Sequence, residues 1–431
     1  MKKYMIISGC SDLNRGDQAL VWETKRLAEE SGFIGQYYLT SERNEPVEQS
    51  KRKGINIISP ILEHPSRRYK NKGNINYSLV LKIKWGVVSA FDLLESLLVL
   101  GNFTRNIIKK ILSIKKRQSI EIIEQADAVF MKGGGLLQTY GGLSSTYSMY
   151  FWVFPILLAH NLKKPVYVMP NSFGPLKGPF VKKIAYSALS KCKIISSRET
   201  LSQKTIEEQL GLEIENYPDL AFELPKAMLD KNSVFEKYYL PNNRKLVAIT
   251  MRPYRFPRSD NPELAYITFK NEMSFFIEWL YNRGYMPVIV EHTLAVNTHE
   301  NDGDCIRDVI SKIDKEQYRF ISDLKYDCQD LKCIYSYCQY IVGTRFHSLI
   351  FAFGSNVPGI AISYTGNKAI GIMHDMGLDD YVVDISEVTA QLLEEKFNRL
   401  VRNEDIVKEK IVHYRNEALE RRKMLIKACS K

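Results

Sequence analysis

Residues 343–349, with the sequence GTRFHSL, place a permanent cation beside a titratable ring. Arg345 and His347 lie two positions apart, after a short apolar run that predicts a strand and before an apolar stretch that predicts a helix. A guanidinium offers a planar fork of donors to a carboxylate or phosphate, and an imidazole exchanges protons near neutral pH. A lone histidine is usually a structural side chain of the core. Beside an arginine at such a turn, a binding and proton-transfer role is favoured.

Two further cations follow neighbouring apolar runs. Arg252 comes directly after the run 246–250, and Lys368 lies in the loop SYTGNK after the run 359–363. Ligands of open parallel sheets bind beyond the carboxyl ends of the strands. Arg252, Arg345 and Lys368 are therefore predicted to lie in one region.

The loop after the first predicted strand is small and polar, with the sequence SGCSDLNRGDQAL from residue 8. Gly9 and Gly16 allow tight turns, and the amides at the start of the following helix can hold an anion or a hydroxyl. Asp17 is either a general base or a helix-capping residue. The glycine spacing fits neither GxGxxG nor GxxxxGK[ST], so a dinucleotide-binding or P-loop enzyme is not supported.

Three other polar segments follow predicted strands of the first half. They are the glycine turn 133–135, the segment NSFGP at 171–175 and the segment SRE at 197–199. Consecutive glycines indicate that a ligand or a neighbouring helix approaches the backbone. Taken alone, Arg198 and Glu199 are most simply a local ion pair at a helix start.

The elements that must position these residues form two series of short apolar runs separated by helical patterns. A chain of 431 residues exceeds the size of one hydrophobic core, so two domains are expected. We predict two Rossmann-like α/β domains facing a cleft, at residues 1–235 and 236–390, with a helical insertion at 64–117 and a helical tail at 391–431. The predicted strands are 4–8, 55–59, 126–131, 166–169, 193–197, 246–250, 287–291, 319–322, 340–343 and 359–363.

The composition, with 45% hydrophobic and 25% charged residues, is that of a globular protein. It excludes a disordered chain and a small disulfide scaffold. The seven cysteines include no CxxC pair, and the histidines lack metal-site spacing, so we expect a reducing cytoplasm and no metal.

The net charge of +11 is concentrated in residues 64–117, where twelve Lys and Arg face only Asp92 and Glu95. This distribution argues against a nucleic-acid binder, since the rest of the chain is nearly neutral. The two acids interrupt the apolar runs of the segment, so no spanning helix is predicted. The segment either lies on an anionic membrane surface or is a helical hairpin packed on its own domain.

The order of these motifs resembles the polysaccharide pyruvyl transferase family over about residues 5–380. The motifs are NRGD at 14–17, the glycine turn, NSFGP, SRE, PDLAF at 218–222 and GTRFH, with the segment 64–117 as an addition to the family core. The resemblance implies a GT-B-like architecture and transfer of pyruvate from phosphoenolpyruvate to a sugar diol, which gives a cyclic ketal and phosphate.

The resemblance also implies roles for residues. His347 would be the general acid, and the carboxylate base would be Asp17 or Asp219, a choice that stays open. No cofactor is implied, and a lipid-linked acceptor would place the protein beside the inner face of the plasma membrane. The donor would be bound by Arg252, Arg345, Lys368, Thr344 and Ser348, and the acceptor by Asn14, Arg15, Gly134, Gly135, Asn171 and Ser172.

Two other functions fit the same architecture. A glycosyltransferase that uses a nucleotide sugar would need an acidic residue for the ribose, and Glu291 is a candidate. A catalytically silent glycan-binding assembly protein would tolerate loss of the cationic residues. Arg252, Arg345 and His347 are all present, which favours an enzyme.

Overall fold

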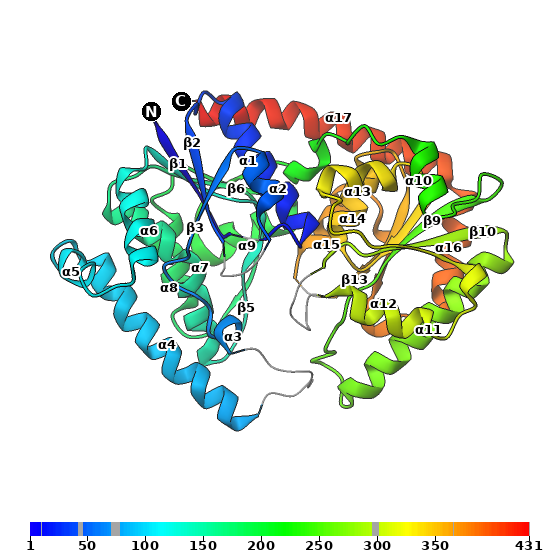
Figure 1. The fold of residues 1–431 in the computed structure, drawn as a ribbon, viewed down its shortest axis with the longest axis horizontal. Helices are drawn as coiled ribbons and strands as arrows, with labels where there is room; N and C mark the ends of the chain where they lie inside the picture. The colour runs from blue at the N-terminus through cyan, green and yellow to red at the C-terminus, as the bar shows by residue number, and fades with distance from the viewer. Residues whose placement is uncertain (10, 42–45, 70–77, 295–300, 365, 431) are drawn as a thin grey trace. The chain divides into compact units, whose positions relative to one another are not determined.

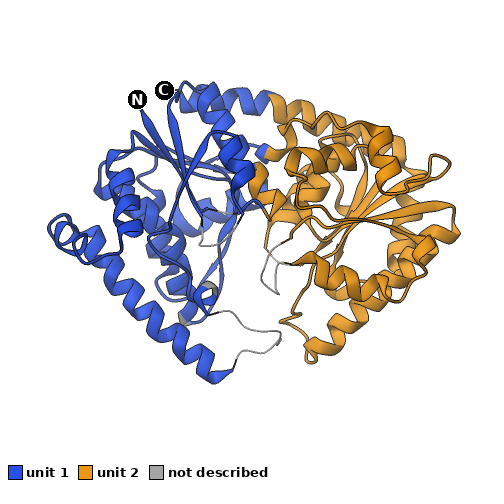
Figure 2. Cartoon of the chain, in the orientation of Figure 1, with its two compact units in different colours: residues 1–12, 20–220, 420–431 blue, residues 13–19, 221–419 orange. Residues whose placement is uncertain are grey.

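A computed structural model describes residues 1–9, 11–41, 46–69, 78–294, 301–364 and 366–430 (Figure 1). The chain divides into two compact units, which Figure 2 distinguishes by colour. The first unit consists of residues 1–12, 20–220 and 420–431, and the second of residues 13–19 and 221–419. The division thus falls at residue 220 rather than at 235, and the helices of the tail are shared between the units instead of forming a separate part.

The first unit is built on a parallel sheet in the order β3-β2-β1-β4-β6-β7-β8, with β5 paired to β6. Its central strand β4 is buried along its whole length, as expected of a strand covered on both faces. The strands are β1 (Lys3–Ile7), β2 (Gln36–Thr40), β3 (Ile55–Ile58), β4 (Ala128–Met131), β5 (Gly134–Tyr140), β6 (Val166–Lys177), β7 (Ile194–Ser197) and β8 (Glu215–Asn216).

Helices connect these strands, and their apolar sides form a core with the sheet. The helix α1 (Arg15–Glu30) begins in the segment assigned to the second unit and continues in the first. The other helices are α2 (Glu48–Arg52), α3 (Pro65–Arg68), α4 (Leu79–Leu100), α5 (Asn102–Ile108), α6 (Ile114–Gln125), α7 (Leu143–Asn161), α8 (Val181–Leu189) and α9 (Thr200–Leu210), followed by the 3₁₀ turn η1 (Leu220–Glu223).

The second unit contains a parallel sheet in the order β11-β10-β9-β12-β13-β14. The order reverses between β9 and β12, which is where ligands of doubly wound sheets bind. The strands are β9 (Lys245–Thr250), β10 (Tyr285–Val290), β11 (Arg319–Ile321), β12 (Tyr340–Gly343), β13 (Gly359–Ser363) and β14 (Val382–Asp384). The two Rossmann-like sheets confirm the predicted fold class.

The helices of the second unit alternate with its strands, as right-handed parallel crossovers require. They are α10 (Lys231–Lys237), α11 (Pro262–Asn282), α12 (Asp302–Ile310), α13 (Cys328–Tyr335), α14 (Phe346–Phe353), α15 (Lys368–Asp375) and α16 (Ala390–Arg402), with the 3₁₀ turns η2 (Lys315–Gln317), η3 (Asp379–Tyr381) and η4 (Ile385–Glu387). The last helix, α17 (Glu404–Cys429), passes from the second unit into the first.

The basic segment 64–117 is helical in its described part, and residues 70–77 lie outside the described residues. One side of α4 packs on α7: Ser96 and Tyr150 hydrogen bond at 2.8 Å, and Tyr147 donates to Asp92 at 3.3 Å. Asp92 also accepts from Arg68 of α3 at 3.0 Å. Of the helices in the described ranges, none has the length and hydropathy needed to cross a membrane.

Candidate functional site

The turn between β12 and α14 is fixed against the end of β9. The Thr344 amide donates to the Thr250 carbonyl at 2.9 Å, and the Ser348 and Thr250 hydroxyls hydrogen bond at 2.8 Å. A Cβ atom on Gly343 would lie 2.1 Å from Thr250 Oγ1, so only glycine fits there. Thr344 and Ser348 are both buried, and their side chains hold this turn at the switch point of the sheet.

Arg345 is oriented by a buried carboxylate. Its Nε and Nη2 atoms both lie 2.7 Å from Asp302 Oδ1, and Asp302 Oδ2 accepts from the Thr293 amide at 2.9 Å. Burial raises the pKa of Asp302 to about 6, against the lowering effect of Arg345. Above that pH the carboxylate is charged and fixes the guanidinium. Nothing in the sequence pattern pointed to Asp302, which has the ordinary residue type of a helix start.

His347 lies between a lysine and the start of α1. Lys368 Nζ is 3.1 Å from His347 Nδ1 and 3.4 Å from Nε2, so the ammonium and the ring are in hydrogen-bond contact. A Cβ atom on Gly16 would lie 2.2 Å from His347 Nδ1. The His347 ring therefore packs directly against the backbone of Gly16, in the space that a side chain at residue 16 would fill. The structure thus brings together two residues predicted for the site, His347 and Lys368.

We expect Gly16→Ala to displace the His347 ring and to lower kcat about 10²-fold, since small misplacements of a reacting group have effects of that size. The melting temperature should fall as well, because the new methyl group would also lie 2.7 Å from the Cβ atom of His347, which no rotation of the ring can move aside. Gly86→Ala is the matched control, since a Cβ atom at Gly86 meets nothing within 4 Å. Steady-state kinetics and thermal unfolding of both variants test this. Unchanged turnover of Gly16→Ala would show that the position of His347 is unimportant.

Arg252 follows β9 and stacks on an aromatic ring. Its guanidinium carbon lies 4.4 Å from the centre of the Tyr364 ring, and its Nε donates to the Pro253 carbonyl at 3.3 Å. Tyr364 also lines a cavity of about 450 Å³ with Tyr254 and Phe256. This volume is within the usual range of small-molecule sites. Aromatic and polar side chains thus surround this space, and Arg252 stacks on Tyr364, one of the residues that line it.

The start of α1 contributes Asn14, Arg15 and Asp17 to the second unit. The Asn14 side chain accepts from the Asp17 amide at 3.2 Å and donates to the Asp17 carboxylate at 2.9 Å, which caps the helix. Arg15 is buried and donates to the Leu324 carbonyl at 3.1 Å. Asp17 is partly exposed and adjoins Gly16, the residue that packs on His347. The residue that caps the start of α1 is thus Asn14 rather than Asp17, and Asp17 is the residue to which Asn14 bonds.

His292 is a buried neighbour of this cluster. Burial lowers its pKa well below the ordinary value, and the charges of His347, Arg345, Lys368 and Arg15 lower it further. Its Nδ1 is 3.1 Å from the Tyr335 hydroxyl, whereas Nε2 has no hydrogen-bond partner within the described ranges. Four basic side chains thus lie close enough to this buried ring to act on its pKa.

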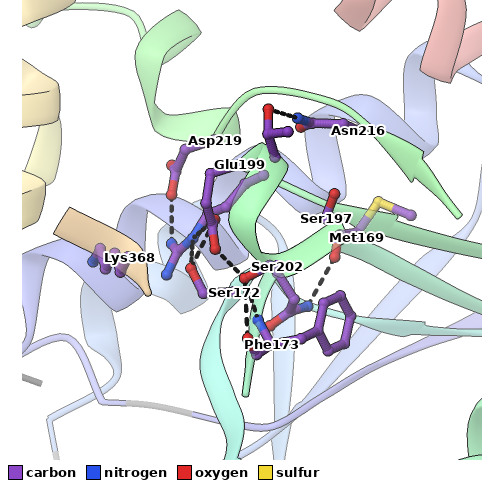
Figure 3. A network of polar contacts seen from close by, with 12 residues as sticks. Met169, Ser172, Phe173, Ser197, Glu199, Ser202, Asn216, Asp219 and Lys368 are labelled. Atoms are coloured by element: carbon purple, nitrogen blue, oxygen red, sulfur yellow. Dashed lines mark hydrogen bonds and ion pairs between the residues drawn. The ribbon is translucent and has the colours of Figure 1, made fainter. Parts of the chain in front are cut away.

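The first unit contains a separate buried network, drawn in Figure 3. Arg198 Nη1 lies 2.5 Å from Asp219 Oδ2, and Arg198 Nε donates to Ser172 Oγ at 2.8 Å. Ser172 in turn donates to Glu199 at 3.0 Å. All four side chains are buried. The close partner of Arg198 is Asp219 rather than the adjacent Glu199, whose carboxylate is 3.9 Å away.

The glycine turn lies beside this network. A Cβ atom on Gly133 would be 2.8 Å from the Pro170 carbonyl of β6 and 3.2 Å from the Leu20 side chain of α1, so both a strand and a helix approach this glycine closely. Cβ atoms on Gly134 and Gly135 would lie 3.7 Å from Asn171 Oδ1 and 3.4 Å from Arg198 Nη2. Neither of those atoms has a hydrogen-bond partner among the residues that the structure describes. One buried acceptor and one buried donor thus face the glycines, and Arg198 was not among the predicted site residues.

Two parallel sheets of this order define a GT-B-like fold, and polar side chains gather at the switch point of the second sheet. UDP-GlcNAc 2-epimerase from Neisseria meningitidis, solved with UDP-GlcNAc, superposes with a TM-score of 0.56 at 11% identity, covering 99% of both chains. The alpha,alpha-trehalose 6-phosphate synthase from Burkholderia multivorans superposes with a TM-score of 0.51 at 11% identity, covering 100% of this chain and 98% of that one. Identities this low establish the fold alone.

The chain belongs to the polysaccharide pyruvyl transferase family, whose model matches residues 14–366. The amylovoran biosynthesis protein AmsJ of Erwinia amylovora is 25% identical over 309 residues, which cover 68% of this chain and 70% of that protein. The predicted family is thereby confirmed, and with it an enzyme of the pyruvyl transferase class.

Proposed function

We propose that the protein transfers pyruvate from phosphoenolpyruvate to a diol on a sugar of a lipid-linked repeat unit, in the synthesis of an exopolysaccharide or capsule. The observation that carries this proposal is the arrangement at the switch point of the second unit. There, Asp302 fixes Arg345, and Lys368 contacts His347. Family membership and the similarity to AmsJ support it.

Phosphoenolpyruvate is a compact anion with a carboxylate and a phosphate, so its site requires several cations. Arg252, Arg345 and Lys368 supply them, and charge-assisted hydrogen bonds are worth about 1.5 to 3 kcal/mol each. Thr344 and Ser348 serve this site by holding the turn, because their hydroxyl groups bond to Thr250 and to the Arg345 carbonyl.

In the proposed reaction, His347 delivers a proton to the methylene carbon of phosphoenolpyruvate, which makes C2 electrophilic. One sugar hydroxyl then attacks C2 and gives up its proton to a carboxylate. The bond from C2 to the phosphate oxygen breaks, and the second hydroxyl attacks C2 to close the ketal. One hydroxyl proton replaces that supplied by His347, and the other leaves with phosphate. General acid and base catalysis typically contributes 10² to 10⁴ in rate.

Asp17 is the better candidate for the base. It is partly exposed and directly follows Gly16, which packs on the His347 ring. Asp219 is buried and holds Arg198 in the first unit. For the acceptor, Asn171 Oδ1 and Arg198 Nη2 offer an acceptor and a donor to sugar hydroxyls beside Gly134, Gly135 and Ser172, whereas Asn14 and Arg15 hold the start of α1.

We expect Arg345→Lys to raise the dissociation constant of phosphoenolpyruvate at least about 10-fold, because lysine keeps the charge but loses the planar fork that Asp302 orients. Titration calorimetry measures this affinity, and thermal unfolding should show a nearly unchanged midpoint. Arg307→Lys is the control, since Arg307 is exposed on α12. Normal donor affinity of Arg345→Lys would assign the arginine to the scaffold. Phosphate release with lipid-linked oligosaccharides tests the whole reaction.

The alternative of a glycosyltransferase that uses a nucleotide sugar rests on Glu291, but the structure shows this side chain bonded inside the second unit. The Glu291 carboxylate is buried and accepts a hydrogen bond from Ser322. A Cβ atom on Gly303 would lie 2.4 Å from Glu291 Oε1, so this carboxylate packs against the start of α12. Pyruvyl transfer therefore accounts better for the cluster around Arg345. We further propose a cytoplasmic location at the inner face of the plasma membrane, for which α4 and α5 provide the surface.

A further inference from the structure

The helices α4 and α5, with the chain up to the start of α6, expose an unusual amount of hydrophobic surface. Phe91, for example, is 69% exposed, Phe103 78% and Ile111 77%. We call the set the apolar face; it consists of Leu79, Val80, Ile83, Val87, Phe91, Leu93, Leu94, Leu97, Phe103, Ile107, Ile111 and Ile114. Exposed hydrophobic side chains gathered in this number on one stretch of chain mark an interaction site.

The spacing on α4 shows that this exposure is organised. Ile83, Val87, Phe91 and Leu94 recur at three- and four-residue intervals, which places them along one side of a helix. Asp92, Ser96 and Val99 are buried on the side that packs on α7. Figure 1 shows α4 as a long helix on the outside of the first unit. One side of α4 thus packs on the first unit. The other side is hydrophobic but exposed, so it adds nothing to the core.

The charges around the apolar face are positive and solvent-facing. Lys82, Lys84, Lys110 and Lys115 are exposed, and none of them has an ion pair within the described ranges. By contrast, Lys109 is paired with Glu124 at 2.7 Å, and Lys116 with Glu95. Only some of the lysines of this segment are therefore available to an anionic surface. The exposed lysines occupy the same stretch as the apolar side chains.

We propose that α4 and α5 dock on an anionic lipid surface, with the apolar face inserted at the headgroup boundary and Lys82, Lys84, Lys110 and Lys115 on lipid phosphates. Helices with this combination of residues lie in the plane of the interface. A second copy of the chain is disfavoured as the occupant, because self-association would bring the exposed lysines toward one another. The lipid-linked acceptor of the proposed function would give the protein a reason to bind a membrane. Binding to vesicles can nevertheless be measured without pyruvyl transfer.

The test is flotation of the full chain with vesicles of phosphatidylcholine, alone or mixed with phosphatidylglycerol. We expect at least about 10-fold stronger binding to the anionic vesicles at low salt. Phe91→Ser/Leu94→Ser should weaken binding at least about 10-fold at both low and high salt, since each change removes apolar area that the lipid surface would bury. Replacement of the four exposed lysines by glutamine should weaken binding mainly at low salt, because salt screens their attraction.

Ile406→Ser/Met424→Ser is the matched control, since these side chains are similarly exposed on α17 and should not affect binding. Circular dichroism verifies that each variant is folded. The proposal is overturned if the wild type floats with neither vesicle, or if Phe91→Ser/Leu94→Ser binds like the control. A concentration-dependent dimer that the same double variant abolishes would assign the face to a second copy. Phosphate release with a water-soluble acceptor should be normal in all variants, which separates this test from that of the proposed function.

Discussion

His347→Gln is expected to bind phosphoenolpyruvate almost normally and to turn over at least about 10²-fold more slowly than the wild type. Glutamine keeps a hydrogen-bonding side chain beside Lys368 and Gly16, but it cannot deliver a proton to carbon. The affinity of the donor should persist, because the cations that bind it are unchanged. The loss is therefore expected in the chemical step rather than in binding.

For His347→Gln, calorimetric titration measures the affinity for phosphoenolpyruvate, and single-turnover phosphate release measures the rate of the chemical step. His374→Gln provides the control, since His374 is exposed on α15 and pairs with Asp379 at 2.9 Å. The control should behave like the wild type in both measurements. Near-normal turnover of His347→Gln would eliminate the general-acid role, and a loss of donor affinity alone would make the ring a binding group.

The second large effect is expected from Asp219→Asn, which should lower the free energy of unfolding by about 3 to 5 kcal/mol, because it removes the close carboxylate of a fully buried Arg198 and leaves only that of Glu199, 3.9 Å away. Asp17→Asn should instead unfold like the wild type and lose about 10²-fold in turnover, as a missing general base predicts. Urea unfolding and steady-state kinetics of the two variants measure both effects.

Asp380→Asn is the control for stability, since Asp380 is exposed in its pair with Arg399 and should contribute at most about 1 kcal/mol. If Asp219→Asn is stable but inactive, Asp219 takes the role of the base. If Asp17→Asn keeps normal turnover, its carboxylate only completes the cap with Asn14. The two variants together therefore decide which carboxylate accepts protons.

The ten strands predicted from apolar runs are all present, because parallel strands covered on both faces must be continuously hydrophobic. The strands β2, β5, β8 and β14 were not predicted. β2 alternates buried and half-buried residues, and β5 begins with glycines, so neither contains a continuous apolar run. β8 consists of the two polar residues Glu215 and Asn216, so it contains no apolar run. β14 has three residues, as does β11, and its length alone does not explain why only β11 was predicted.

The sequence by itself determined which residues could do the chemistry, since Arg252, Arg345, His347 and Lys368 each follow a strand that the local pattern reveals. Only the tertiary structure decided their partners: Asp302 for Arg345, Gly16 for His347 and Asp219 for Arg198. Those partners are distant in the chain and have common residue types, so no local pattern identifies them. The exposure of the apolar face was likewise decided by packing, because α4 buries Asp92, Ser96 and Val99 against α7 and leaves its more hydrophobic side exposed, which hydropathy alone does not predict.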